Sequence, residues 1–258
     1  MKDILDNLVL KYETPDFINK DPIQFAHRYK TKTDIEIAAF IASLFAYGKR
    51  ELFIHKLNLL FDYFDSSPTK FISNINNISH VKNIEYRFSK NIDICQILEI
   101  LHILYRQDNG SLEMLFSKGW EQSNDIFKTL QFVSDYFYTK ITKNVTSGFY
   151  HLLPNPSNNS PMKRMNMFLR WLIREGNVDL GIWRFIKKSE LLIPLDVHVA
   201  RVSRELNLLN RSSNDATSVR LLTQRLKEFD SSDPVKYDFA IFGLGVSNEL
   251  SPVQPIQS

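Results

Sequence analysis

Apolar residues recur along most of the chain at intervals of three and four positions, the period of a helix with one buried face. No stretch sustains the strict apolar–polar alternation of a half-buried strand. The first half therefore predicts a helical bundle. Its expected helices cover residues 34–45, 52–64, 91–106 and 124–142. Thr33 or Asp34 should cap the first of these, and Gly48 should end it.

The segment LLPNPSNNSP, at residues 152–161, is rich in proline, asparagine and serine and predicts a loop. We expect it to separate an N-terminal lobe, residues 1–152, from a second lobe, residues 161–250, with a frayed tail at 251–258. The helical period returns beyond the loop. The helices expected there are 162–174, a short one opened by Asp179, one after Pro194 capped by Asp196, 214–229, and 234–243 ended by Gly243 and Gly245.

Charge is nearly balanced over the 258 residues, with 32 Lys and Arg against 29 Asp and Glu, which excludes a polycationic protein of the histone kind. Residues 161–211 differ, since they hold ten basic and five acidic residues, a local net charge of +5. Such an excess indicates a surface that binds nucleic-acid phosphates. Solvated helix faces also collect Lys and Arg, and this second interpretation is equally favoured. If DNA binds, we expect this segment to carry the contact and salt to weaken it steeply.

Cysteine and histidine usage excludes several metal sites. Cys95 is the only cysteine, so there is no internal disulfide, no Cys-rich zinc site and no four-cysteine iron–sulfur cluster. The histidines show no metal-ligand spacing, and we expect no metal or cofactor. The first residues lack the apolar core of a signal peptide, and the run 35–47 is too short to span a membrane. We expect a cytoplasmic monomer that does not enter membranes.

Two residues at expected helix starts are candidates for chemistry. Asp196 follows Pro194 at the mouth of a helix, where free N–H groups hold a carboxylate ionised. An ordinary N-cap uses aspartate in the same way. Lys163 adjoins Met162 and nearby apolar residues, which could desolvate its amine and favour loss of the proton. A solvated helix start would also accept this lysine.

The segment Ile193-Pro-Leu-Asp196-Val-His-Val-Ala-Arg-Val resembles the one that bears the essential aspartate in the helix-hairpin-helix (HhH-GPD) DNA glycosylases. Pro161-Met-Lys163-Arg-Met-Asn-Met-Phe-Leu169 resembles the helix start where bifunctional members place a nucleophilic lysine. Residues 237–245 resemble the family's late helix, and residues 37–49 its first core helix. The chain also resembles an uncharacterised bacterial family marked by K-R-x-N-M-F-L-R-W and I-P-L-D-x-H-V. That second resemblance implies no activity.

The glycosylase resemblance implies an all-α, two-lobed fold that binds double-stranded DNA and excises damaged purines such as 8-oxoguanine, with or without lyase activity. Lys163 would attack the sugar C1′ of a flipped nucleotide, and Asp196 would stabilise positive charge on the sugar. The archaeal 8-oxoguanine enzymes, which the chain resembles, carry an acid and an aromatic residue four positions apart on the late helix. By that match, Asp238 and Phe242 would bind the substrate. Two further candidates rest on their own chemistry: Trp171, which could stack on a flipped base or belong to the core, and His198, which could orient Asp196 or be an ordinary surface histidine. The DNA phosphates would be contacted by Arg164, Arg170, Arg174, Asn158 and Asn159.

The hairpin departs from the family pattern. In the glycosylases the hairpin usually has the sequence L-P-G-[VI]-G, and its glycines let backbone N–H groups approach a phosphate. Residues 153–161 contain no glycine, although asparagine also adopts left-handed conformations. Two alternatives therefore stay open: a non-enzymatic nucleic-acid-binding module on the same fold, and a protein-interaction scaffold.

Overall fold

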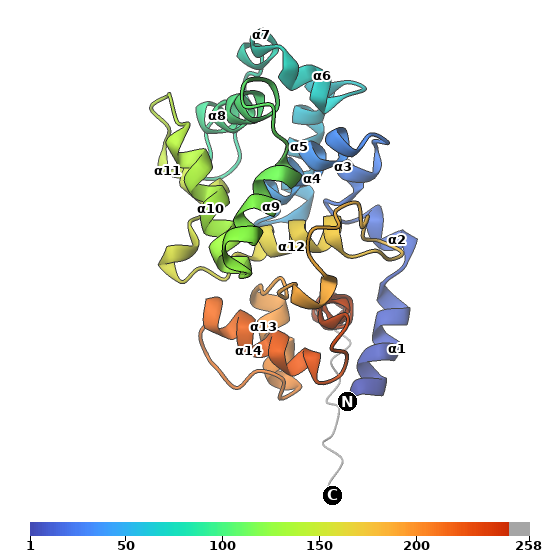
Figure 1. The fold of residues 1–258 in the computed structure, drawn as a ribbon. Helices are drawn as coiled ribbons and strands as arrows, with labels where there is room; N and C mark the ends of the chain where they lie inside the picture. The colour runs from blue at the N-terminus through green and yellow to red at the C-terminus, as the bar shows by residue number, and fades with distance from the viewer. Residues whose placement is uncertain (248–258) are drawn as a thin grey trace, which may run out of the picture.

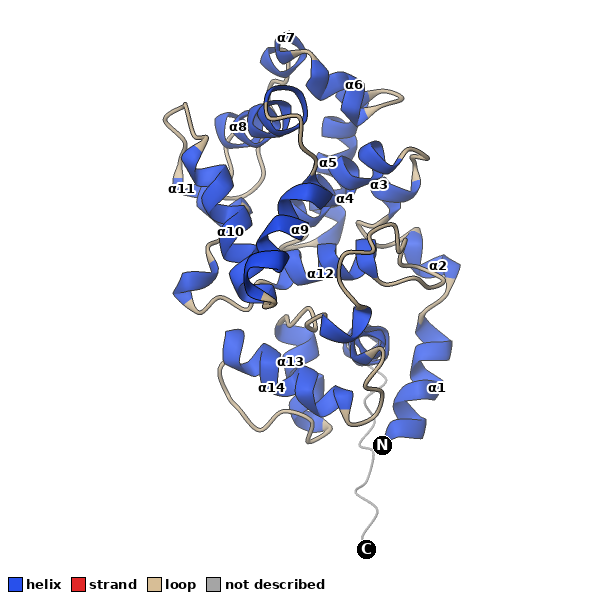
Figure 2. Cartoon of the chain, viewed as in Figure 1, coloured by secondary structure: helices blue, strands red, loops and turns tan. Residues whose placement is uncertain are grey.

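The computed structural model describes residues 1–247, so the expected frayed tail at 251–258 lies outside the described residues. Within them the α-helices and short 3₁₀ or π turns, labelled η, are joined by loops, and no strand forms beyond the isolated bridges Tyr86–Ser89 and Glu175–Leu180 (Figure 2). The all-α expectation is confirmed. No helix in the described part is long and apolar enough to cross a membrane.

The elements follow one another in this order: α1 (Lys2–Tyr12), α2 (Pro15–Ile18), α3 (Gln24–His27), α4 (Lys32–Phe45), α5 (Arg50–Phe64), α6 (Pro68–Ser73), α7 (Ile75–Ser79), α8 (Asn91–His102), η1 (Ile103–Gln107), α9 (Leu112–Ser123), α10 (Ile126–Thr139), α11 (Ser147–Leu152), η2 (Pro156–Asn158), α12 (Lys163–Ile173), η3 (Lys188–Glu190), α13 (Val197–Glu205), α14 (Ala216–Lys227), η4 (Pro234–Lys236) and α15 (Tyr237–Ser247).

Helix α4 is the centre of the larger helical group. Its residues from Asp34 to Phe45 are all buried, because α3, α5, α6, α9 and α12 pack around it. The apolar stripe of α12 supplies one of these contacts, since Phe168 meets Phe40 edge to face at a ring distance of 5.5 Å. Helix α12 is thus fixed against the core of the first half of the chain.

Helices α1, α13, α14 and α15 form the second group, in the lower half of Figure 1. Helix α15 packs against both α1 and α13. The division expected at the 152–161 loop therefore does not describe the packing. The N-terminal helix α1 lies with the C-terminal helices, and α12 lies with the N-terminal group, because each buries its apolar face there.

Several expected boundaries need correction. Thr31, rather than Thr33 or Asp34, caps α4 by accepting a hydrogen bond from the Asp34 N–H. No helix follows Asp179, which is buried instead between two arginines. Helix α15 continues through Gly243, where a Cβ would lie 2.4 Å from the Tyr12 ring. That glycine serves the close approach of α1 and does not end the helix.

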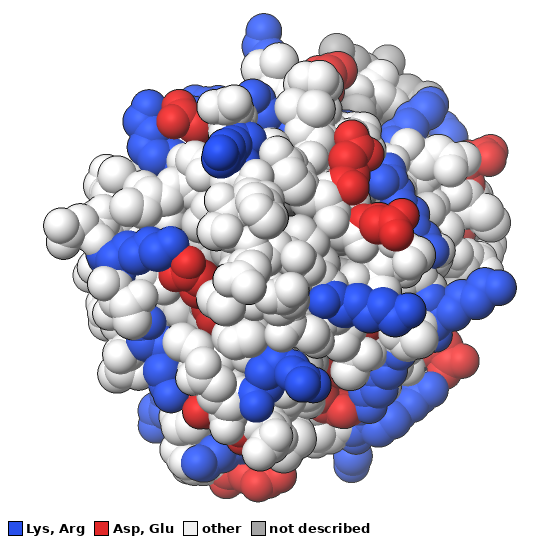
Figure 3. Space-filling view, turned by 90° about the horizontal axis from the view of Figure 1, so that it is seen from above, with Lys and Arg blue, Asp and Glu red and all other residues white. Residues whose placement is uncertain are grey.

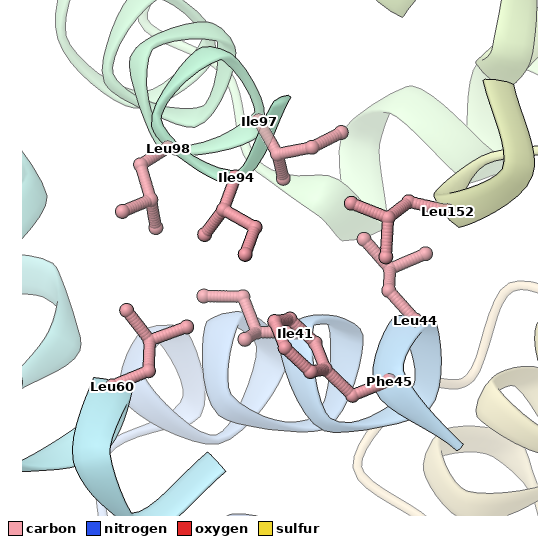
Figure 4. Close-up of a pocket in the computed structure, with 8 residues that line it drawn as sticks. All are labelled: Ile41, Leu44, Phe45, Leu60, Ile94, Ile97, Leu98 and Leu152. Atoms are coloured by element: carbon pink, nitrogen blue, oxygen red, sulfur yellow. The ribbon is translucent and has the colours of Figure 1, made fainter. Parts of the chain in front are cut away.

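A small void lies inside the larger group, lined by eight apolar side chains of α4, α5, α8 and α11 (Figure 4). Its volume is about 10 Å³. Without a polar group to hold a water or ligand, such a void belongs to core packing.

Candidate active-site cleft

A cleft of about 1030 Å³ opens between the two helical groups. Its walls combine the loop before α3, the turn between α4 and α5, the N-terminal ends of α12 and α13, and one face of α15. Segments far apart in the sequence thus meet at one concave surface, which is the usual form of a small-ligand or nucleotide site.

Lys163 and Asp196 face each other in this cleft. The Lys163 Nζ lies 3.9 Å from Asp196 Oδ2, and the side chains are 26% and 21% exposed. Lys163 is the first residue of α12 and follows Met162, which is buried and holds the left-handed backbone conformation at φ 50°. A left-handed methionine is sparsely populated, and such strain is often found beside functional residues.

Asp196 divides its two carboxylate oxygens between two tasks. Oδ1 accepts hydrogen bonds from the N–H groups of His198 and Val199, both at 2.9 Å, and caps α13. Oδ2 is the atom nearer Lys163. The expected cap is confirmed, and the same side chain also meets the cleft.

Asp238 lines the cleft from the first turn of α15. Its Oδ2 accepts a hydrogen bond from the Arg170 guanidinium, and its buried Oδ1 has no hydrogen-bond partner among the described residues. Burial raises the pKa of Asp238 to about 7 despite the attraction of Arg170. A carboxyl with this pKa is partly protonated near neutral pH and can donate a hydrogen bond as well as accept one.

Phe242 lies one turn after Asp238 and also lines the cleft. Its ring packs on Phe17 at 6.2 Å, and the Arg50 guanidinium lies over it at 5.7 Å from the ring centre. Asp238 and Phe242, the two residues expected to form a substrate pocket on this helix, therefore line the same cleft as Lys163 and Asp196. His198, on the first turn of α13, lines the cleft and is exposed.

Trp171 needs correction as a substrate-binding residue. It is fully buried in the core and does not line the cleft. Arg170 and Arg174 are 3% and 5% exposed, and carboxylates surround both guanidinium groups. Arg170 pairs with Asp179 and Asp238, and Arg174 pairs with Glu13, Asp179 and Asp233. Because these ion pairs occupy the two side chains, the expectation that they contact phosphate is corrected.

Ion pairs also involve several exposed basic residues of segment 161–211. Several of its exposed arginines pair with neighbouring acids, as Arg184 does with Glu175 and Arg201 with Glu205. Seen from above the view of Figure 1, basic and acidic side chains are interspersed around a largely uncharged centre (Figure 3).

Arg164 differs from Arg170 and Arg174. It lines the cleft and donates hydrogen bonds to two main-chain carbonyls, those of Leu44 at 2.6 Å and His151. Its guanidinium lies 5.0 Å from the centre of the Tyr47 ring, and burial lowers its pKa to about 10. A partly buried cation without a carboxylate partner favours the binding of an anion.

The two asparagines of the expected hairpin lie on the loop before α12. Asn159 takes the left-handed conformation at φ 55°, as the glycine-free pattern allows. Its carbonyl accepts the Ala216 N–H, and its side-chain amide donates to Asp215 at 3.3 Å. Asn159 thus fastens the loop to the start of α14. Asn158 is exposed beside it.

Sequence reasoning missed several cleft residues, among them Asp21, Tyr47 and Arg50. Asp21 is buried between α2 and α3, its Oδ1 accepts the Ile23 N–H at 3.1 Å, and burial raises its pKa. The dipeptide Asp21-Pro22 reads as an ordinary helix start, so no local signal marks it. These positions become visible only when the first fifty residues fold against α12.

No group of three or more His, Cys, Asp or Glu side chains that could hold a metal ion occurs in residues 1–247. Comparison with known proteins gives a family without an assigned activity: the family described as "Protein of unknown function (DUF2400)" matches residues 21–247. No curated protein matches the chain. No solved structure matches it either.

Proposed function

Since the chain belongs to the DUF2400 family, whose function is unknown, we propose from its cleft that it is a DNA N-glycosylase with lyase activity that excises a damaged purine base such as 8-oxoguanine. One observation carries the proposal. The Lys163 amine and the Asp196 carboxylate lie 3.9 Å apart at two helix N-termini, on the wall of a cleft of about 1030 Å³. These are the two groups that the glycosylase resemblance singles out.

The pair is suited to attack on a sugar carbon. Asp196 is the carboxylate positioned to take a proton from the Lys163 amine, whose lone pair then forms a bond to C1′ of an extruded nucleotide. The bond from C1′ to the base breaks, and its electron pair leaves with the base, which takes up the proton that Asp196 received from the amine. The sugar ring then opens as O4′ takes a second proton from the amine, which leaves a Schiff base between Lys163 and C1′. Asp196, ionised again, faces the positive charge of this Schiff base.

The base would enter the part of the cleft formed by α15. Asp238 offers an unpartnered oxygen there, and its pKa of about 7 lets the carboxyl donate to a purine acceptor or accept from a purine N–H. Phe242 supplies an apolar surface beside it. Arg50 lines the same wall, and its guanidinium would bind the phosphate next to the extruded base.

A non-enzymatic DNA-binding module is the second candidate, favoured by the glycine-free loop. Asn159 ties that loop to α14 through Ala216 and Asp215, which leaves fewer of its polar groups for a phosphate. A module of this kind would bind DNA through the cleft without forming a covalent intermediate.

Borohydride trapping on duplexes that contain 8-oxoguanine or other damaged purines separates the two candidates. The glycosylase proposal expects a covalent protein–DNA complex with the wild-type protein and none with Lys163→Gln. The matched control is Lys187→Gln, because Lys187 is exposed in the same basic segment and does not line the cleft. Absence of trapping and of base release on all lesions, together with salt-sensitive DNA binding, would leave the binding module.

A further inference from the structure

The four-residue turn from Tyr86 to Ser89 is held rigidly at the rim of the cleft. Tyr86 and Ser89 exchange both main-chain hydrogen bonds, at 3.0 and 2.9 Å. The Tyr47 hydroxyl donates to the Tyr86 carbonyl at 3.0 Å, and the Ser89 hydroxyl to the Gly148 carbonyl at 3.2 Å. These contacts join the turn to the end of α4 and to α11, so the two residues at its tip have a fixed position.

Both tip residues are unusual for a structural turn. Arg87 holds a left-handed backbone at φ 52°, where glycine or asparagine would be unstrained. Phe88 is 55% exposed, although a large aromatic ring gains most from burial. The Arg87 guanidinium lies 5.5 Å from the centre of the Phe88 ring. A strained backbone that presents a cation and an aromatic ring to solvent indicates a contact surface.

The tip is continuous with the cleft. A Cβ on Gly48, which lines the cleft, would lie 2.5 Å from the Arg87 guanidinium. The Phe88 ring meets the ring of His151, another cleft residue, edge to face at 4.9 Å. His151 Nε2 is buried without a hydrogen-bond partner among the described residues, and burial together with Arg164 and Arg87 lowers its pKa.

The local charge favours an anion. In residues 1–247, neither Arg164 nor Arg87 forms an ion pair with a carboxylate. Ten residues further along, at the C-cap of α12, the side chain of Arg174 by contrast meets three carboxylates. Two guanidinium groups without acids, beside an exposed aromatic ring, match the phosphate and the base of a nucleotide.

We propose that Arg87, Phe88 and Arg164 form a second nucleotide subsite, which holds the neighbour of the nucleotide that enters the cleft. The two guanidinium groups bind its phosphates, and the Phe88 ring stacks on its base. The assignment rests on the proposed function, because it is the extruded nucleotide in the cleft that brings its neighbour to the rim. Phosphate contact would give affinity irrespective of sequence, and stacking would tolerate any base.

The test is equilibrium binding of the full chain to a duplex that carries a tetrahydrofuran abasic-site analogue with 2-aminopurine beside it. Phe88→Ala should weaken binding about tenfold, within the usual range for loss of one base–aromatic stack, and should leave the salt dependence unchanged. Arg87→Gln should weaken binding and reduce the slope of log affinity against log salt by about one. Protein binding should change the 2-aminopurine fluorescence in the wild type, and much less in Phe88→Ala.

Met114→Ala and Arg184→Gln are the matched controls, because Met114 is 60% exposed, Arg184 is exposed, and neither lines the cleft. Both should bind as the wild type does. Wild-type affinity in Phe88→Ala and Arg87→Gln would overturn the subsite, as would failure of the wild-type protein to bind this duplex.

The subsite and the glycosylase activity can fail separately. If no lesion is excised but Phe88→Ala still binds the duplex weakly, the subsite stands and the proposed function falls. If a base is excised and Phe88→Ala binds normally, the proposed function stands and the subsite falls. Preference for a tyrosine-phosphorylated peptide over the duplex would assign the same residues to a protein partner and overturn the nucleotide assignment.

Discussion

The Lys163 amine lies 3.9 Å from the carboxylate of Asp196, although a helix and a long irregular segment separate the two residues in sequence. Asp196 caps α13 through one oxygen and meets Lys163 through the other. Its structural and its proposed chemical task thus use different atoms of one side chain, and a substitution that preserves the first can remove the second.

Asp196→Asn should separate these tasks. Asparagine caps a helix as well as aspartate does, so we expect the free energy of unfolding to change by less than about 0.5 kcal/mol. Without a carboxylate opposite Lys163, base release should fall by about a hundredfold or more. Chemical denaturation and single-turnover base release measure the two effects.

The control for this substitution is Asp125→Asn, which changes the cap of α10 away from the cleft. We expect it to leave base release at the wild-type rate. Wild-type base release by Asp196→Asn would contradict a catalytic task for Asp196 and reduce it to a helix cap.

Helical periodicity was sufficient to predict the all-α fold class, but only some of the helix caps, since neither Asp34 nor Asp179 caps a helix. The cap that Asp196 makes at the start of α13 could be predicted, because both the apolar stripe that follows and the capping carboxylate are local signals. Gly243 shows the limit. Glycine reads as a helix end, but here it lies inside α15, because the ring of Tyr12 packs against it from a segment at the other end of the chain.

In the candidate site, too, the residues marked by local sequence signals could be predicted, and those that depend on long-range contacts could not. Lys163 and Asp196 could be chosen from motifs that each lie within a few residues, and the structure brings them together. The role of Arg174 could not be foreseen, because its three carboxylates come from the N-terminal helix and from two later loops. From the sequence alone, a basic residue in a helical segment is predicted to be exposed, because its long-range partners are not known.

Arg174 should stabilise the fold. Arg174→Ala removes one cation from a cluster with Glu13, Asp179 and Asp233. The buried Glu13 carboxylate then loses its arginine partner, whereas Asp179 keeps Arg170 and Asp233 keeps Lys188. We expect a loss of about 3 to 5 kcal/mol in the free energy of unfolding. Arg184→Ala is the control, because Arg184 and its partner Glu175 are 70% and 73% exposed, and its effect should stay below about 1 kcal/mol. Equal effects in urea denaturation would refute the structural role of the buried cluster.

Gly243→Ala should destabilise the protein although alanine is the better helix former. A Cβ at Gly243 would lie 2.4 Å from the Tyr12 ring, which forces α1 and α15 apart. Overpacking of this kind costs about 1 to 3 kcal/mol, more than the gain of about 1 kcal/mol in helix propensity. Thermal unfolding measures the difference. The double variant Gly243→Ala with Tyr12→Ala removes the obstructing ring and should lose less than the two single effects added together; strict additivity would argue against the contact.

Asp238 should make stability fall as pH rises through the acidic range. Burial raises the pKa of its carboxyl from its ordinary value of 3.8 to about 7, with Arg170 opposing this rise and Asp196 adding to it. Between about pH 4 and 7, the folded protein therefore keeps a proton on Asp238 that the unfolded chain releases. The contribution of Asp238 to the free energy of unfolding is fully present below its pKa in the unfolded chain. It is lost as the pH rises through its pKa in the folded protein.

Asp238→Asn removes this titration, so its stability relative to the wild type should improve steadily from pH 4 to pH 7, by up to about 4 kcal/mol. Lys163 and Asp179, which also act on Asp238, remain in both proteins, and their own titration largely cancels in the comparison. Urea denaturation at several pH values measures the difference, and Asp62→Asn, at an exposed carboxylate, is the control that should stay parallel to the wild type. Parallel curves for Asp238→Asn and the wild type would show that Asp238 is ionised in the folded protein throughout this range. Its carboxyl could then only accept hydrogen bonds from a bound base, and a purine acceptor would need a different donor in the cleft.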